Sequence, residues 1–552
     1  MKNILVLIAL LLIFSCNKKN NTLDVQENIE TPFVWEGANV YFLLTDRFNN
    51  GDLSNDINFE RTAETGKLRG FEGGDLKGIT QKIKQGYFTD LGINAIWMTP
   101  IVEQIHGGTD EGTGLSYAFH GYWASDWTAL DPNFGTKEDL HELVEEAHKR
   151  GIRVLLDAVI NHTGPVTEKD PVWPSDWVRT APQCDYKSFE TTTACTLVEN
   201  LPDIRTESNQ NVELPPHLVK KWKKEERYEQ EMDELNAFFE RTDYPKAPRF
   251  YIMKWLTDYI TEFGIDGYRV DTVKHTEAYV WQEFKKECDF SFIEYKKNNP
   301  KKVLDTNNFY LVGEVYNYNI SDAQSFDFGD KKVNYFDNAF NSLINFELKT
   351  NATQMTTEAM FKKYSTLLNS DLKEYGVLNY LSSHDDGQPF DPNREKPFET
   401  ATKLLLSPGA SQVYYGDESA RSLVVEGTEG DATLRSFMNW DAIENNEETQ
   451  EVLNHWQKLG QFRANHPAVG AGIHQMITQQ PYVFYRSYQK EDFEDIVVMG
   501  LDLPKGDKIL DVSKVFNDGD ILFDRYSNQN VSVENGIIKM NSAYNVVLIA
   551  QR

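Results

Sequence analysis

The sequence predicts an α/β protein built on a (β/α)8 TIM barrel, with an inserted domain after strand 3 and a C-terminal antiparallel β-sandwich domain. Short segments that are apolar on both faces alternate with helical segments over most of the 552 residues, which is typical of a parallel sheet covered by helices. This alternation is interrupted between about residues 163 and 250, and helical patterns end near residue 470. The number of units and the length favour a closed barrel over a doubly wound sheet.

Seven segments are predicted as barrel strands because each is short and rich in branched or aromatic residues. The clearest helix, residues 137–150, has apolar residues at helical spacing and an N-capping Thr136. A strand follows it directly. The predicted strands are residues 40–44, 95–98, 152–157, 267–270, 310–312, 377–381 and 412–415.

The interruptions divide the folded part of the chain into three domains. The barrel is expected in two parts, residues 38–162 and 251–465. The inserted domain between them, residues 163–250, is rich in Pro, Thr and Cys and then contains a charged helix at residues 217–241. Short alternating strands indicate a β domain over residues 466–552.

The N-terminus has the pattern of an export signal. Lys2 precedes an apolar run of 11 residues, which is too short to span a membrane because a span needs about 20. Cys16 follows where the run ends, as in bacterial lipoprotein signals; an ordinary secretory signal is the alternative. We expect residues 1–16 to be the signal, residues 17–37 a tether, and the protein an outer-membrane lipoprotein anchored through Cys16, on the periplasmic face or the cell surface.

The charge of the chain limits its binding partners, and its cysteines limit the covalent and metal links that it can form. With 56 basic and 85 acidic residues the net charge is −29, which repels phosphate backbones and argues against nucleic acid. We expect a monomer. Export permits a disulfide between Cys184 and Cys195, which the sequence leaves open, whereas Cys288 is expected as a buried free thiol. No Cys/His spacing indicates zinc.

Polar clusters follow four predicted strands. Because barrel enzymes place reactive groups at the carboxyl ends of strands, carboxylates from all four clusters should meet at one end of the barrel. Like charges there raise the pKa of one carboxyl, which leaves a protonated acid beside an ionised nucleophile. Hydrolysis of a glycosidic bond requires such a pair. The clusters are residues 157–162, 267–271, 311–314 and 381–385.

These four segments, in this order, resemble those of the α-amylase family of glycoside hydrolases, and the resemblance covers nearly all of residues 38–550. It implies a retaining enzyme that cleaves α-glucans, with Asp271 as nucleophile, Glu314 as general acid/base and Asp385 as a third carboxylate on the sugar hydroxyls. In this resemblance Arg269 keeps the nucleophile ionised and Asp157 has a structural role. The implied substrate-binding residues are His120, Tyr122, His162, Arg269, Lys274, His275 and His384.

The residues after the nucleophile indicate the bond that is cleaved. Thr272, followed by Lys274 and His275, accompanies α-1,4 cleavage in the family, which points to an endo-acting α-amylase similar to secreted or periplasmic bacterial enzymes. A neopullulanase, a maltogenic hydrolase or a glucan transferase on the same scaffold is the alternative, because the same carboxylates serve all of them. A non-enzymatic glycan-binding protein would normally have lost one of these carboxylates.

The resemblance also implies two structural calcium sites, since oxygen-rich loops select this cation. The first is an Asn/Asp-rich loop, for which an ordinary turn is the alternative. The second ties the inserted domain to the barrel. The implied ligands are Asn50, Asp52, Asn55, Asp56, the Gly73 carbonyl and Asp75 for the first, and Asn161, Asp203 and the His275 carbonyl for the second.

Overall fold

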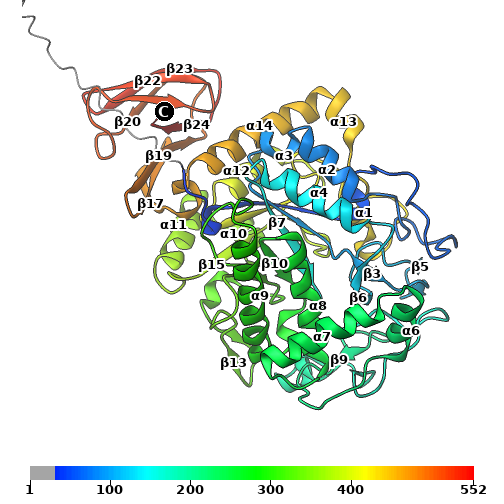
Figure 1. The fold of residues 1–552 in the computed structure, drawn as a ribbon. Coiled ribbons are helices and arrows are strands. Elements are labelled where there is room, and N and C mark those ends of the chain that lie inside the picture. The colour runs from blue at the N-terminus through cyan, green and yellow to red at the C-terminus, as the bar shows by residue number, and fades with distance from the viewer. Residues whose placement is uncertain (1–30, 552) are drawn as a thin grey trace, which may run out of the picture.

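The computed structural model describes residues 31–551 and contains a closed barrel of eight parallel strands (Figure 1). Every residue of these strands is buried, which explains why they are apolar on both faces. Around the barrel the order is β1 (Asn39–Leu43), β16 (Ala410–Tyr414), β15 (Gly376–Asn379), β14 (Ser342–Asn345), β11 (Tyr310–Gly313), β10 (Gly267–Val270), β7 (Arg153–Ala158) and β2 (Ala95–Met98).

All seven predicted strands are present within three residues of their expected bounds, and the predicted barrel is confirmed. The eighth strand, β14, was not predicted. It begins and ends with the polar residues Ser342 and Asn345, which weaken the apolar pattern. Asn345 is nevertheless buried, because its amide donates hydrogen bonds to Asn379 and Tyr364.

Helices surround the barrel (Figure 1). The predicted helix after residue 136 is α4, which begins with a capping box between Thr136 and Asp139 and ends at His148. The longer helices are α2 (Leu76–Lys84), α4 (Lys137–His148), α8 (Pro248–Phe263), α9 (Ala278–Asn298), α11 (Thr357–Leu368), α12 (Pro397–Leu405) and α14 (Glu447–Asn465). Shorter ones are α1 (Thr45–Phe48), α3 (Tyr87–Asp90), α10 (Leu348–Gln354), α13 (Trp440–Asn445) and α15 (Ala468–Ala471).

The segment after β7, the third barrel strand along the chain, departs from the strand–helix alternation as predicted. It contains β8 (Val178–Arg179), α5 (Glu190–Thr193), β9 (Asp203–Ile204), α6 (Pro216–Lys224) and α7 (Tyr228–Thr242). The prediction of one helix over residues 217–241 was wrong, because Glu226 adopts a left-handed backbone (φ 60°) that ends the first helix. Cys184 and Cys195 form a disulfide, and Cys288 is a buried free thiol as predicted.

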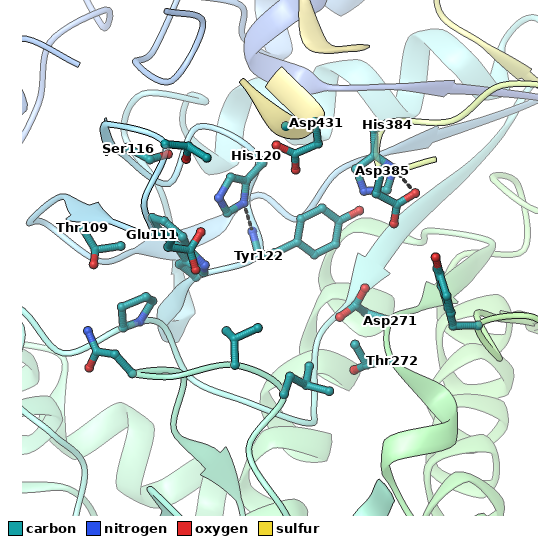
Figure 2. A pocket seen from close by; sticks show the side chains of 18 of the residues that line it. Thr109, Glu111, Ser116, His120, Tyr122, Asp271, Thr272, His384, Asp385 and Asp431 are labelled. Carbon is teal, nitrogen blue, oxygen red and sulfur yellow. Dashed lines mark hydrogen bonds and ion pairs between the residues drawn. The ribbon is translucent and has the colours of Figure 1, made fainter. Parts of the chain in front are cut away.

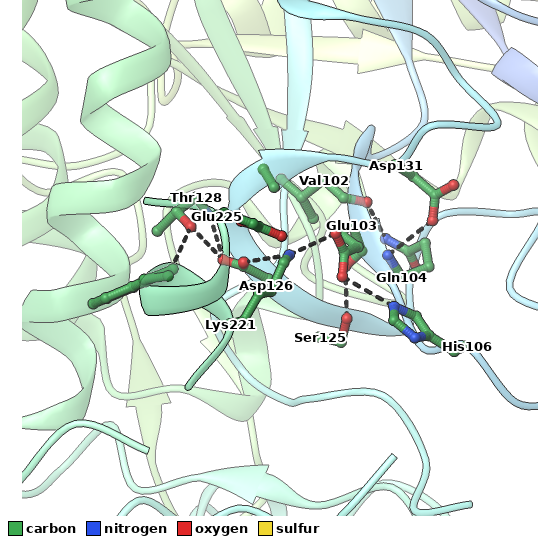
Figure 3. Close-up of polar contacts among 12 residues, drawn as sticks. Val102, Glu103, Gln104, His106, Ser125, Asp126, Thr128, Asp131, Lys221 and Glu225 are labelled. Atoms are coloured by element: carbon green, nitrogen blue, oxygen red, sulfur yellow. Dashed lines mark hydrogen bonds and ion pairs between the residues drawn. The ribbon is translucent and has the colours of Figure 1, made fainter. Parts of the chain in front are cut away.

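A polar network fixes α6 to a two-stranded sheet made of β3 (Val102–Gln104) and β6 (Ala124–Leu130) (Figure 3). The Lys221 ammonium lies 2.6 Å from Glu103 and 2.6 Å from Asp126. Burial alone would raise the pKa of Asp126, but Lys221 and Arg227 outweigh it, so this pKa is lowered. The inserted segment is therefore held by charge pairs in addition to apolar packing.

The N-terminal segment requires a correction of the predicted tether, residues 17–37. Trp35, in a short 3-10 helix, stacks on Tyr310 with ring centroids 3.9 Å apart, and the Arg153 guanidinium lies 3.7 Å from the Phe33 ring. Tyr310 and Arg153 begin β11 and β7. Residues 33–37 thus cover the amino-terminal end of the barrel, whereas the predicted signal and Cys16 lie outside the described residues.

The C-terminal β domain is present, and its eight strands are hydrogen-bonded in one continuous antiparallel order. The layers of the predicted sandwich are parts of this single curled sheet, which encloses an apolar cluster of its own. Alternate burial along β22 explains the period-2 pattern. The strands are β17 (Ile473–Thr478), β18 (Tyr482–Lys490), β19 (Phe493–Leu501), β20 (Gly506–Asp511), β21 (Ile521–Asp524), β22 (Gln529–Glu534), β23 (Ile537–Ser542) and β24 (Val547–Ala550).

Residues 31–551 include no helix that is both long and apolar enough to cross a membrane.

Candidate active site

A cavity of about 1280 Å³ lies where the carboxyl ends of the barrel strands meet the inserted segment. Asp271 directly follows β10, Glu314 directly follows β11, and Asp385 lies on the segment after β15. All three line the cavity, as the positions of the strand ends predicted. Figure 2 shows the Tyr122 ring in the middle of the cavity wall, with Asp385 on one side and Asp271 below it.

Arg269 lies beneath this wall and connects the carboxylates. Its Nη1 is 2.7 Å from Asp271 Oδ1 and 3.0 Å from Asp157 Oδ2, and its Nη2 is 2.9 Å from Glu314 Oε1. Arg269 and Asp271 are two residues apart, so their side chains point to the same face of the strand. In the parallel pairing of β10 with β7, Arg269 is directly opposite Asp157. The register of β10 with β7 therefore brings Arg269 next to Asp157. Asp271 and Glu314 join them because they directly follow the ends of β10 and β11.

The cluster contains an acid that keeps its proton at neutral pH. Burial, and then the nearby carboxylates of Asp271 and Asp385, raise the pKa of Glu314 to about 8, although Arg269 and the Thr272 N–H group oppose the shift. Burial likewise raises the pKa of Asp157 to about 7 and raises that of Asp385. A protonated Glu314 thus lies beside an Asp271 carboxylate whose negative charge is paired with Arg269.

Three nearly parallel rings lie next to the carboxylates (Figure 2). Tyr122 is nearly parallel to His384 (19°, centroids 5.4 Å apart) and to His120 (21°, 5.9 Å). The Tyr122 hydroxyl donates a hydrogen bond to Asp157, which fixes the ring. Burial lowers the pKa of both histidines, so they are neutral and can hydrogen-bond to hydroxyl groups. The Tyr122 ring, which lines the cavity, suits the apolar face of a sugar.

Two predicted substrate-binding residues do not line the cavity. His162 is only 4% exposed, and its Nε2 lies 3.1 Å from the Tyr122 carbonyl, so it supports Tyr122 from behind. Arg269 is 1% exposed and is covered by the carboxylates that it pairs with. His162 Nδ1 is nevertheless buried without a hydrogen-bond partner, and direct contact of His162 or Arg269 with a substrate stays a prediction.

The other end of the cavity is lined by Lys274 and His275, as predicted. Sequence reasoning missed Tyr186 and Tyr316, whose rings lie 5.9 Å and 5.2 Å from the Lys274 ammonium. Tyr316 could have been found, since it is two residues after Glu314. Tyr186 belongs to the inserted segment, where no strand end marks a position as functional.

Beyond the three rings, the cavity is lined by further residues that the sequence analysis did not assign to the site. Glu111 belongs to the loop between two very short strands, β4 (Thr109–Asp110) and β5 (Leu115–Ser116), and Asp431 precedes Arg435 by four residues. Asp431 forms ion pairs with Arg69 and Arg435. These residues come from three separate loops, which explains why no single pattern in the sequence revealed them.

The residues expected at the first calcium site lie close together. A Cβ added to Gly73 would come within 2.4 Å of Asn50 Nδ2 and 2.7 Å of Asp56 Oδ1, and the buried Asn55 Oδ1 has no hydrogen-bond donor. Asp75, by contrast, accepts backbone N–H groups as the N-cap of α2, and Asp52 is paired with Lys77. Asn55 Oδ1 is thus available to a hard cation, whereas Asn50 and Asp56 are hydrogen-bonded to each other, and Asp52 and Asp75 have other protein partners.

The second expected calcium site is also compatible with a cation. Asp203 is 1% exposed, and its Oδ2 and the Asn161 amide nitrogen are buried without a hydrogen-bond partner. Burial raises the pKa of Asp203 to about 9, and the Arg179 Nε at 3.0 Å only partly opposes this shift. In the described part of the chain, no cluster of three or more His, Cys, Asp or Glu side chains could hold a metal. Either site would therefore depend on amide and carbonyl oxygens.

Comparison with known proteins gives matches over most of the chain. Residues 42–442 match the family model "Alpha amylase, catalytic domain". A "Periplasmic alpha-amylase" of Escherichia coli (strain K12) is 35% identical over 85% of this chain and 74% of that protein. A "Cyclomaltodextrin glucanotransferase" of Geobacillus stearothermophilus is 27% identical over 82% of this chain, which spans only 58% of that relative.

Solved structures share the fold. An Anoxybacillus α-amylase superposes with a TM-score of 0.64 at 22% identity, over 94% of this chain and 99% of that one. An α-amylase from Geobacillus thermoleovorans, solved in complex with acarbose, gives a TM-score of 0.63 at 22% identity, with the same coverage of 94% and 99%. At this level of identity the likeness concerns the fold alone.

Replacing Arg269 by Met tests the role of the guanidinium. We expect the free energy of unfolding to fall by about 3–5 kcal/mol at pH 8, because buried carboxylates lose their cation. The loss should shrink toward pH 4, since carboxyl groups in the unfolded chain begin to take up protons near that pH, and keeping the buried carboxyl groups of the variant protonated then costs less free energy. Thermal and denaturant unfolding at pH 4, 6 and 8 measures this trend.

The matched control is Arg421→Met. Arg421 is equally buried, but its guanidinium donates to the backbone carbonyls of Tyr415 and Leu434 and to Ser436. Its replacement should destabilise the protein by a similar amount at each pH. Equal pH trends for the two variants would contradict the proposed charge balance.

Proposed function

The chain belongs to the α-amylase family of glycoside hydrolases, and we propose that it cleaves internal α-1,4-glucosidic bonds of starch-like α-glucans by double displacement. The family establishes an α-amylase-type glycoside hydrolase, whereas the bond and the endo mode of action are the proposal. One observation supports it above all: Glu314, whose pKa is raised to about 8, lies in one cavity with an Asp271 carboxylate paired with Arg269. Retaining glycosidases need this combination.

In the first step, the Asp271 carboxylate attacks the anomeric carbon while the Glu314 carboxyl gives its proton to the departing glycosidic oxygen. The C–O bond to the leaving sugar breaks, and a covalent glycosyl ester forms on Asp271. Asp385, on the segment after β15, accepts hydrogen bonds from sugar hydroxyls. Stacking on Tyr122 keeps the ring in place, since this side chain is fixed by Asp157.

In the second step, the ionised Glu314 removes a proton from water, which attacks the anomeric carbon and releases Asp271. The Thr272 N–H group, 3.0 Å from Glu314 Oε2, keeps the carboxyl oriented in both steps. If a sugar hydroxyl replaces the water, the same chemistry is glycosyl transfer. Relatives named cyclomaltodextrin glucanotransferase make this transfer the second candidate function.

We also propose two structural calcium ions, one at the Asn50–Asp56 loop and one beside Asn161 and Asp203. The buried Asn55 Oδ1, which has no hydrogen-bond donor, and the buried Asp203 carboxylate, which Arg179 only partly balances, support them. A bound cation would offset the cost of burying Asp203 and connect the inserted segment to the barrel. None of the proposed chemistry passes through these ions.

The proposed location is an exported monomer anchored by lipid on Cys16. The apolar run before Cys16 and the relative named periplasmic α-amylase support export. The ligand class, an α-glucan or a maltooligosaccharide, is supported by related structures described with acarbose and with maltose.

Product analysis distinguishes the candidate functions. Amylose and pullulan are incubated with the enzyme, and products are resolved by length over time. We expect mixed maltooligosaccharides from amylose and no products from pullulan. Panose or one short product from pullulan would instead support a neopullulanase or a maltogenic hydrolase, and cyclic products from amylose would support the transferase.

Replacing Asp271 by Asn should reduce turnover of amylose by at least about 10⁴-fold, because no covalent intermediate can form. Circular dichroism and binding of maltooligosaccharides should be unchanged. Asp337→Asn, at an exposed position, is the matched control and should keep full activity. A variant Asp271→Asn with more than a trace of activity would show that another residue is the nucleophile.

The pH dependence of kcat/KM should show the titration of Glu314. Cleavage of maltooligosaccharides needs the protonated form, so the rate should fall about tenfold per pH unit above roughly pH 8, where the proton is lost. A maltosyl fluoride should not show this decrease, because fluoride leaves without protonation. The same decrease for both substrates would assign it to another group.

Chelation tests the calcium proposal. Excess EDTA should lower the melting temperature, since a ligand at about 100 times its Kd stabilises the folded state by about 2.7 kcal/mol. Asn55→Ala and Asp203→Ala should each remove part of the calcium response. An identical melting temperature with calcium and with EDTA would refute both sites.

A further inference from the structure

The loop closed by the Cys184–Cys195 disulfide forms part of the cavity wall, although it belongs to the inserted segment. It contains the short helix α5 and is joined to the barrel side at two points. The Thr192 carbonyl accepts a hydrogen bond of 2.9 Å from His275 Nδ1, in a buried position. At the second point, the Phe189 N–H group donates to Asp330 Oδ1, and its ring packs edge-on against Phe328.

The loop presents the Tyr186 ring to the cavity. Tyr186 has a left-handed backbone (φ 59°), which is costly for an aromatic residue and is maintained only by the surrounding structure. Its side chain is 52% exposed, and its hydroxyl donates to the Leu197 carbonyl. The ring is edge-on to His275, with centroids 5.9 Å apart. Tyr186 is thus held in place yet has a large free surface.

Across the cavity, Tyr316 faces the same space. Its ring is 45% exposed and packs edge-on against Phe346. The Lys274 ammonium lies between the two tyrosines and donates to the Tyr316 carbonyl at 3.2 Å. Two half-exposed rings and one cation therefore border a single part of the cavity, and one of the rings belongs to the disulfide loop.

This part of the cavity is on the leaving-group side of the reaction. Glu314 gives its proton to the departing oxygen, so the departing sugar lies next to Glu314 and away from the Tyr122 surface. Tyr316 follows Glu314 by two residues, and Lys274 follows Asp271 by three. Sugar units on this side would therefore meet Tyr186 and Tyr316 first.

We propose that the disulfide is a positioning element for the leaving-group side of the site: by closing the loop it holds Tyr186 against the departing, or accepting, glucose unit. The proposal rests on the function proposed above. The bond limits the positions that the loop can adopt, so Tyr186 is already in place before the sugar binds. Opening the loop should weaken binding of departing and accepting sugars but leave the nucleophile and the acid unchanged.

The test compares two substrates in the full-length protein. Maltoheptaose occupies both sides of the cleavage point, whereas maltosyl fluoride occupies only the donor side. For Cys184→Ser/Cys195→Ser and for Tyr186→Leu, kcat/KM on maltoheptaose should fall about tenfold, mainly through KM, as expected for the loss of one positioned aromatic contact. Hydrolysis of maltosyl fluoride should stay within about twofold. The ratio of transfer to hydrolysis should also fall.

Cys288→Ser serves as the matched control, because it makes the same Cys-to-Ser change at the buried free thiol, which does not line the cavity; it should behave as the wild type on both substrates. Equal losses on both substrates would show that the loop only supports the fold and would overturn the proposal, as would no loss on maltoheptaose. A wild-type protein inactive on maltosyl fluoride and on maltoheptaose would instead refute the proposed function.

Discussion

The pairing of one buried guanidinium with three carboxylates is the interaction on which the site depends. Arg269 contacts Asp157, Asp271 and Glu314, which come from three adjacent strands of the barrel. Removing so many charges from water would cost several kcal/mol per ion without a partner. The register of β7, β10 and β11 brings the charges together. The site therefore depends on the pairing of these strands in the closed barrel. Burial and the neighbouring carboxylates together outweigh the single positive charge, and Glu314 therefore keeps its proton.

The strands that the sequence predicted best are those in which every residue is buried. Strands β2 and β10 were predicted at their observed bounds: every residue in them is buried, and Arg269 alone interrupts the apolar character of β10. β14 was missed because its ends are polar, and the Asn345 amide nitrogen there donates to partners 19 and 34 positions along the chain. The helix predicted over residues 217–241 is two helices, since a left-handed residue is not visible in an amphipathic pattern. Local patterns thus fail where a long-range contact or a single backbone angle decides the structure.

The same distinction applies to the site. Asp271, Glu314 and Asp385 were found because strand ends determine where they lie. Loops from the inserted segment and from other parts of the chain build the rest of the cavity. Tyr186 reaches it through a loop that is joined to His275 by a hydrogen bond across 83 positions. Contacts of this kind depend on the conformation of loops. The alternation of strands and helices and the spacing of residues in motifs do not predict that conformation. Substrate range is therefore the property least accessible to sequence reasoning.

The packing of Trp35 on Tyr310 has a consequence for the orientation of the molecule. This contact holds residues 33–37 at the amino-terminal end of the barrel, opposite the cavity. With the proposed lipid on Cys16, the 17 residues from there to Phe33 reach at most about 60 Å. A lipid there would attach the enzyme through the end of the barrel that lies opposite the cleft. A polymer too large to approach the lipid surface could still enter the cleft.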